Sequence, residues 1–214
     1  FEAAEILKSN GIIPLAMGSV KGYELGHTFE TVLLGTLGPE AYRGLWTGET
    51  KWSDERVTQA LETFKKMLSY ANTDHSALSW DAAFEYVVSG KAAMLIQGDW
   101  VHGWILAKNL PDFNFGWAAA PDTEGAYIAV NDTFGIPKGA PHMDAAMAFM
   151  RVVGSKAAQE KFAPLKGSIP VRVDADVSSM NDYTQWSAAA YGKDEIVASC
   201  VHGSAANENW ATQY

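Results

Sequence analysis

A short apolar segment, residues 92–96, ends in polar and aromatic residues that could contact a ligand. These residues are Gln97, Gly98, Asp99 and Trp100. The segment is too short to cross a membrane and is flanked by glycines, so we expect a buried β-strand. We expect Gly98 to allow a sharp turn and Asp99 to cap a helix that starts at Trp100. In open α/β sheets, ligands bind in the crevice beyond the carboxyl ends of the strands, which makes this stretch the first candidate site.

Glycoside hydrolysis is one chemistry that such a site could perform. Sugar-cleaving enzymes use two carboxylates that flank the glycosidic bond, and this chain offers aromatic side chains for a sugar cleft, including eight tryptophans. The candidate acids are Asp99, Asp122, Glu124 and Asp132. Each of them can equally be a helix cap or a turn residue. A carbohydrate-active enzyme domain is therefore the alternative to a binding protein.

Other catalytic and metal-binding motifs do not occur in the sequence. Gly90-Lys91 lacks the remaining residues of a phosphate-binding loop, and no His-Glu-x-x-His or Gly-x-Ser-x-Gly is present. The five histidines are dispersed along the chain, and no two of them are four residues apart. The segment that begins at Asp174 lacks the glycine and the glutamate of a calcium loop. We expect no metal site, no cofactor and no catalytic residues.

Composition narrows the class of partner. The chain has 214 residues, 48% of them hydrophobic, and a formal net charge of −9 without a dense cluster of lysine and arginine. This charge argues against nucleic acid or an anionic membrane as the main partner and favours an uncharged or cationic ligand. The single cysteine, Cys200, rules out an internal disulfide. Because residues 1–10 begin directly as an amphipathic helix, we expect the chain to be part of a longer protein.

Helices alternate with short strands along the sequence, which predicts an α/β fold. We expect strands at residues 12–17, 92–96, 113–119 and 126–136. We expect helices at residues 1–10, 22–37, 40–46, 53–70, 79–90, 99–110, 143–154, 156–162 and 178–190, and a last helical piece that ends at Tyr214. Gly38-Pro39 should separate two of these helices, and Ser53 should cap the helix that follows it. Residues 164–172 should form a loop and a strand.

Five separated blocks together resemble a known family. The blocks are residues 10–15, 90–100, 134–139, 162–172 and 202–203. They resemble the carboxyl-terminal part of the extracellular solute-binding proteins of bacterial ABC sugar importers, and within these the glucose/mannose-binding group. The resemblance covers nearly the whole chain in the same order, and the segment Pro-Leu-Lys-Gly-Ser-Ile-Pro-Val-Arg at residues 164–172 is its most specific part.

The resemblance implies a periplasmic-binding-protein-like fold, in which two α/β lobes close on a sugar. Residues 1–133 would form the first part of the second lobe, residues 134–165 an excursion that belongs to the first lobe, and residues 166–214 a return to the second lobe. Most of the first lobe would be missing. The implied partners are a small sugar and the membrane permease subunits of an importer, with association of the chain through the surface left by the missing lobe. The implied location is periplasmic or extracellular, with a lipid tether in the full-length protein.

The resemblance also implies which residues contact a hexose. Trp100 would stack against the apolar face of the sugar, and Asp132 would accept hydrogen bonds from two adjacent hydroxyls. Lys166 and His202 would contact further hydroxyls. Weaker candidates are Gln97, Asp99 and His102. Each main candidate also has a structural interpretation: a buried tryptophan at a helix start, a turn aspartate, a surface lysine and a core histidine.

Overall fold

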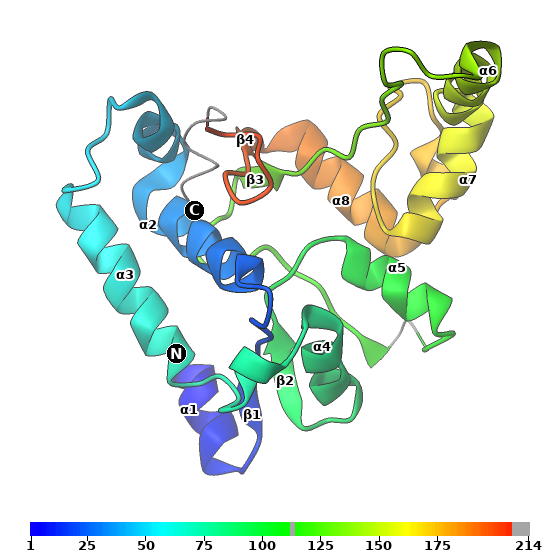
Figure 1. The fold of residues 1–214 in the computed structure, drawn as a ribbon. Helices are drawn as coiled ribbons and strands as arrows, with labels where there is room; N and C mark the ends of the chain where they lie inside the picture. Colours follow the sequence, from blue (N-terminus) through cyan, green and yellow to red (C-terminus); the bar gives the residue numbers. More distant parts are fainter. Residues whose placement is uncertain (112–113, 207–214) are drawn as a thin grey trace. The chain divides into compact units, whose positions relative to one another are not determined.

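The computed structural model of the protein describes residues 1–111 and 114–206 (Figure 1). These residues form two compact units. The described part of unit 1 comprises residues 1–97, 119–130 and 195–206, and that of unit 2 comprises residues 98–111, 114–118 and 131–194. In the described part of the chain, none of the helices has both the length and the hydrophobicity needed to cross a bilayer.

The first sheet of unit 1 consists of the two strands predicted from short apolar segments. Strand β1 (Ile13–Ala16) pairs in parallel with β2 (Ala92–Leu95). Helices α1 (Glu2–Ser9) and α4 (Trp80–Val88) pack beside these strands, and the 3₁₀ turn η1 (His75–Ala77) precedes α4. The buried residues where α4 meets the strands are all alanines, namely Ala16, Ala83 and Ala92. Small side chains allow the helix to lie close to the sheet.

The main core of unit 1 lies between α2 (Tyr23–Thr47), α3 (Glu55–Leu68) and the second sheet, in which β3 (Ala126–Ala129) pairs in parallel with β4 (Glu195–Ala198). Its buried residues are Leu33, Leu34, Leu37, Tyr42, Leu45, Val57, Ala60 and Val197. Helix α2 contains both helices predicted on either side of Gly38-Pro39. Gly38 has a φ of 74° and a ψ of 166°, so it breaks the helical geometry at the predicted point.

Unit 2 is built from α5 (Trp100–Ala107), α6 (Met143–Val153), α7 (Lys156–Lys166), the 3₁₀ turn η3 (Val177–Ser179) and α8 (Asp182–Lys193). Helix α7 continues through Pro164, where the sequence predicted a loop, and ends only at Lys166. Gly167 stops it with a left-handed φ of 93° and a hydrogen bond from its N–H to the Ala163 carbonyl oxygen. Lys166 is therefore a residue of a helix terminus rather than of a loop.

Several local predictions were wrong for identifiable reasons. Asp54, not Ser53, caps α3, because its carboxylate accepts a hydrogen bond from the Arg56 N–H. Residues 114–119 form no strand, and residues 112–113 lie outside the described residues. The strand predicted at residues 126–136 is limited to β3, because its partner β4 has only four residues. Residues 207–214, where the last helical piece was predicted, also lie outside the described part.

Helices α6 and α7 leave large apolar side chains exposed, and α6 has no buried residue. The exposed fractions are 56% for Phe149, 62% for Val152, 49% for Phe162 and 71% for Leu165. Exposed apolar side chains that gather on neighbouring elements are typical of surfaces that another chain or domain covers. The division of the chain into lobes of a larger protein stays a prediction.

We expect the 214-residue chain on its own to self-associate through these helices. In sedimentation velocity at increasing concentration, its mean sedimentation coefficient should rise. The double variant Phe149→Ser/Val152→Ser should weaken the association about 10-fold or more, because each removed side chain contributes on the order of 1 kcal/mol of apolar burial. Leu61→Ser, which replaces a half-exposed leucine of α3, is the matched control. A monomer at every concentration would contradict the expectation.

Candidate functional site

Two predicted ligand contacts, Asp132 and Lys166, form an ion pair in unit 2. The Lys166 Nζ lies 2.9 Å from the Asp132 Oδ2, and the two side chains are 29% and 66% exposed. Lys166 is the last residue of α7, where the negative end of the helix dipole favours a cation. An ion pair this exposed contributes at most about 1 kcal/mol to stability. Stability therefore does not explain the pair, and both groups remain accessible to a polar ligand.

Asp99 lies in the electric field of this ion pair. Burial raises the pKa of Asp99, Lys166 lowers it and Asp132 raises it again. Lys166 thus interacts with two carboxylates, one partly buried and one exposed. Asp99 stands at the N-cap position of α5, as predicted, but it has helical φ and ψ and its side chain makes no capping hydrogen bond.

Trp100 begins α5, and its indole lies against the backbone of Gly98. A Cβ atom on Gly98 would lie 2.2 Å from Cζ3 of the Trp100 ring, closer than any real contact. Gly98 has no positive φ, so the sharp turn predicted there is not the reason for a glycine. The glycine is needed because the indole occupies the space that a side chain would fill.

Helices α5 and α7 touch through their backbones beside this site. A Cβ atom on Gly103 would lie 2.2 Å from the Lys166 carbonyl oxygen, and one on Gly167 would lie 2.2 Å from the Asp99 carbonyl oxygen. This close contact places Lys166 next to the start of α5, where Asp99 and Trp100 lie. Sequence reasoning missed Gly103, although a glycine inside an apolar helix is a signal for close packing.

The weaker candidate His102 is 4% exposed within α5. Its ring stacks on Tyr183, with ring centroids 4.5 Å apart, and meets the edge of Trp117 at 6.1 Å. Tyr183 and Trp117 also contact each other. This aromatic packing favours the interpretation of His102 as a core residue of unit 2.

His202 and Gln97 belong to unit 1. His202 follows β4, and its Nε2 lies 3.2 Å from Nδ1 of His27 on α2. Its ring also meets the edge of Tyr23, with centroids 6.2 Å apart. Gln97 follows β2 and lines a small cavity that Glu24 of α2 also lines. His27 was not predicted, because its contact with His202, 175 positions away, leaves no local pattern in the sequence.

A buried carboxylate, Glu30, holds the loop that carries His202. Glu30 is 3% exposed and accepts hydrogen bonds from the Tyr42 hydroxyl at 2.5 Å, the Ser199 hydroxyl at 2.6 Å and the Cys200 N–H. The His202 N–H in turn donates to Ser199 Oγ at 3.1 Å. Burial, with the Glu30 charge as a smaller cause, raises the pKa of Cys200 to about 11. Among the described residues, no three histidine, cysteine or acidic side chains come together as a metal site.

We expect His27 to make folding less favourable in acid. Burial, with His202 as a smaller cause, lowers the pKa of His27 from 6.5 to about 4. Between these pH values the unfolded chain binds a proton that the folded chain does not, so the free energy of unfolding falls as pH falls. The loss is on the order of 3 kcal/mol. Urea unfolding at pH 7.5 and 4.5 should show a smaller loss for His27→Gln than for the wild type. His142→Gln, at an exposed histidine, should behave as the wild type; an equal loss in His27→Gln would refute the assignment.

We expect that no side chain fits at Gly103, where the backbones of α5 and α7 touch. We expect Gly103→Ala to lower the free energy of unfolding by about 3 kcal/mol or more, because the added methyl meets backbone atoms that cannot move aside alone. Gly192→Ala is the matched control: Gly192 lies in α8 with open space around it and should gain about 0.5–1 kcal/mol. Chemical denaturation measures both. A Gly103→Ala variant as stable as the wild type would contradict the packing described.

The fold is that of periplasmic binding proteins. A solved structure described as the bacterial solute receptor AcbH matches with a TM-score of 0.82, over 98% of this chain and 55% of that one, at 21% sequence identity. The match confirms the α/β, periplasmic-binding-protein-like fold class. The sequence also matches the family of bacterial extracellular solute-binding proteins over residues 1–160. This chain belongs to that family, in agreement with the periplasmic or extracellular location expected.

Two relatives extend the match along the chain. An uncharacterised ABC transporter extracellular-binding protein of Pyrococcus horikoshii is 36% identical over 211 residues, which cover 97% of this chain and 47% of the relative. The xylose/arabinose-binding protein XacG of Haloferax volcanii is 33% identical over 188 residues, 85% of this chain and 40% of the relative. The chain thus spans about half the length of the relatives it matches.

Proposed function

We propose that this chain is part of a sugar receptor that binds a glucose-like hexose in a cleft between two lobes and delivers it to an ABC importer. Membership in the solute-binding family supports binding without a chemical step, rather than glycoside hydrolysis. Similar proteins are described as binding neutral monosaccharides: xylose and arabinose for XacG, and β-D-galactopyranose for AcbH. A neutral sugar also suits a chain with a net charge of −9 better than an anion would.

The observation that carries the proposal is the ion pair of Asp132 and Lys166 beside Asp99 and Trp100. A hexose has apolar C–H faces surrounded by hydroxyls, so its site needs an aromatic plane and charged groups that form strong hydrogen bonds. In unit 2, Trp100 supplies the aromatic plane. The exposed Asp132 carboxylate can accept from two adjacent hydroxyls, while Lys166 donates to a hydroxyl oxygen.

The ion pair also accounts for selection of an uncharged ligand. Asp132 and Lys166 neutralise each other before a ligand arrives, so a sugar hydroxyl can join them without bringing an unbalanced charge into the site. An anionic ligand would compete with two carboxylates, Asp99 and Asp132, for a single lysine. We propose that His202 of unit 1 contributes a further hydrogen bond, and that Gln97 and Asp99 have supporting roles.

Delivery requires that the receptor differ in shape with and without sugar. Binding of the sugar favours closure of the two lobes. Permease subunits can then distinguish the closed form from the open one. This part of the proposal concerns the whole receptor, of which the present chain supplies one portion.

Calorimetric titration with D-glucose tests the proposed site. In the receptor that contains this chain, Asp132→Asn and Lys166→Met should each raise the Kd for glucose about 10- to 100-fold. Each substitution removes a charged hydrogen bond to a sugar hydroxyl and also leaves the other residue of the ion pair without its partner. Asp174→Asn is the matched control, because Asp174 is another exposed aspartate of unit 2 in an ion pair, here with Arg172.

Titrations with D-galactose and D-xylose beside glucose identify the preferred sugar. Binding of glucose by Asp132→Asn with the wild-type heat and Kd would remove Asp132 from the site. Binding of another neutral monosaccharide in place of glucose, with the same dependence on Asp132 and Lys166, would keep the site and change its ligand.

A further inference from the structure

Glu24, in the first turn of α2, is a buried carboxylate without a hydrogen-bond partner among the described residues. Its exposed fraction is 3%, and neither Oε1 nor Oε2 has a donor within hydrogen-bonding distance there. Glu30, one and a half turns further along the same helix, is equally buried but accepts from three donors. An ionised carboxylate without such donors costs several kcal/mol to bury. A cation bound beside the Glu24 carboxylate would offset this cost.

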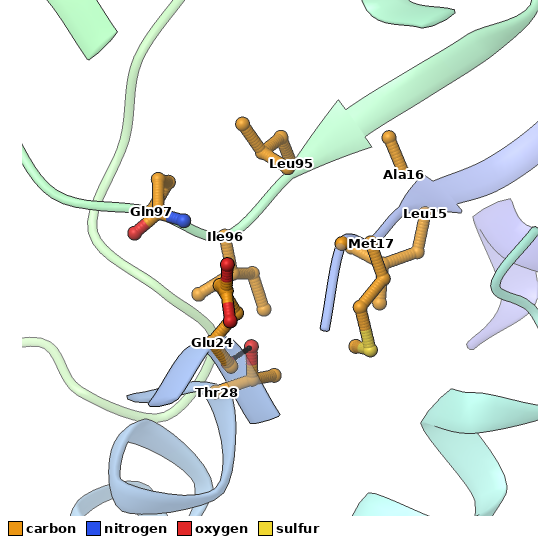
Figure 2. Close-up of a pocket in the computed structure, with 9 residues that line it drawn as sticks. Leu15, Ala16, Met17, Glu24, Thr28, Leu95, Ile96 and Gln97 are labelled. Atoms are coloured by element: carbon orange, nitrogen blue, oxygen red, sulfur yellow. Dashed lines mark hydrogen bonds between the residues drawn. The ribbon is translucent and has the colours of Figure 1, made fainter. Parts of the chain in front are cut away.

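The Glu24 side chain extends from α2 toward the residues that end β2 (Figure 2). It lines a cavity of about 10 Å³, formed where the parallel strands β1 and β2 end. The other lining residues are Leu15, Ala16, Met17, Gly18, Thr28, Leu95, Ile96 and Gln97. This volume holds about one particle of the size of a water molecule, far less than a sugar.

Residues that carry oxygen ligands for a cation, Glu24 and Thr28 among them, line this cavity. The Thr28 hydroxyl donates its hydrogen to the Glu24 carbonyl oxygen at 3.1 Å, so its oxygen lone pairs are left to act as acceptors. Met17 and Ile96 at the strand ends also line the cavity, and backbone carbonyl groups are common ligands of hard cations in proteins.

The Glu24 carboxylate is not balanced by an ion pair: in residues 1–111 and 114–206, no ion pair includes Glu24. The neighbouring Tyr23 has its pKa raised by burial and, in addition, by the carboxylates of Glu24 and Asp81. The amino end of α2 offsets part of the Glu24 charge, but only by about 0.3–2 kcal/mol. A water molecule would supply hydrogen bonds without charge, whereas a cation would supply the missing charge.

We propose that the cavity binds one monovalent alkali cation, Na⁺ or K⁺, held by the Glu24 carboxylate, the Thr28 hydroxyl oxygen and backbone oxygens at the ends of β1 and β2. A single carboxylate balances one positive charge, whereas sites for divalent and transition metals use more acidic or nitrogen ligands. The described residues form no such cluster. This site is separate from the proposed sugar site. Its effect is to tie the start of α2 to the two strand ends.

Thermal unfolding in different salts tests the proposal. In 100 mM NaCl or KCl, the wild-type chain should have a Tm about 2–4 °C higher than in 100 mM choline chloride, whose cation is too large for the cavity. Glu24→Gln keeps the shape of the side chain but removes the charge, so the Tm of this variant should be the same in all three salts. Glu62→Gln, at an exposed glutamate of α3, should respond as the wild type does.

A crystallographic measurement gives a second readout that does not depend on how well the variant folds. Crystals of the wild-type protein soaked in Rb⁺ or Tl⁺ should show an anomalous peak beside the Glu24 carboxylate. Equal wild-type Tm values in all three salts, a salt response retained by Glu24→Gln, or a water molecule in place of the anomalous peak would overturn the proposal. None of these readouts involves sugar, so they are independent of the outcome of the glucose titrations.

Discussion

Helices α5 and α7 approach until backbone meets backbone at Gly103 and Gly167, and the candidate site of unit 2 depends on this contact. The Asp99 carbonyl oxygen lies where a side chain of Gly167 would begin, and the Lys166 carbonyl oxygen lies where one of Gly103 would begin. The start of one helix is thereby held against the end of the other. Two candidate sugar contacts that are 66 positions apart in sequence, Trp100 and Lys166, reach the same region because two residues lack a Cβ atom.

In unit 1, a buried carboxylate holds a candidate site residue in place. Glu30 anchors the loop after β4 through hydrogen bonds from the Ser199 hydroxyl and the Cys200 N–H and, through Ser199, fixes the backbone N–H of His202. Glu24, on the same helix, lies at the strand ends without such donors in the described structure. Two glutamates with the same burial thus have opposite electrostatic situations. Glu30 accepts hydrogen bonds from protein groups, whereas Glu24 lies where we propose that a cation from solution binds.

The sequence predicted well those features that depend on short segments. Strands β1 and β2 follow from apolar residues between glycines, and the break in α2 follows from Gly38-Pro39. It predicted less well where each helix begins and ends. Ser53 and Asp54 are both good caps, but Arg56 donates its backbone N–H and its guanidinium to the Asp54 carboxylate, so Asp54 caps α3. Pro164 usually ends a helix, but in α7 the helix runs on until Gly167 adopts a left-handed conformation.

The candidate site shows the same division. Trp100 follows from its position after a buried strand, and Asp132 and Lys166 from a resemblance of whole sequence blocks; the structure brings Asp132 and Lys166 into contact. His27, Glu24 and Glu30 were missed, because an ionisable residue on the inner side of a helix has the same local pattern as one on the outer side. Gly98 was recognised for the wrong reason, since the space it leaves is filled by an indole two residues later.

The Glu30 cluster has a consequence for the redox chemistry of the chain. Cys200 donates its backbone N–H to Glu30, and its pKa of about 11 leaves on the order of one thiol in ten thousand as thiolate at pH 7. Disulfide exchange and oxidation proceed through the thiolate. The one cysteine of this chain is thus kept inert mainly by its burial, with the charge of Glu30 as a smaller cause, and it can persist as a free thiol in an oxidising compartment.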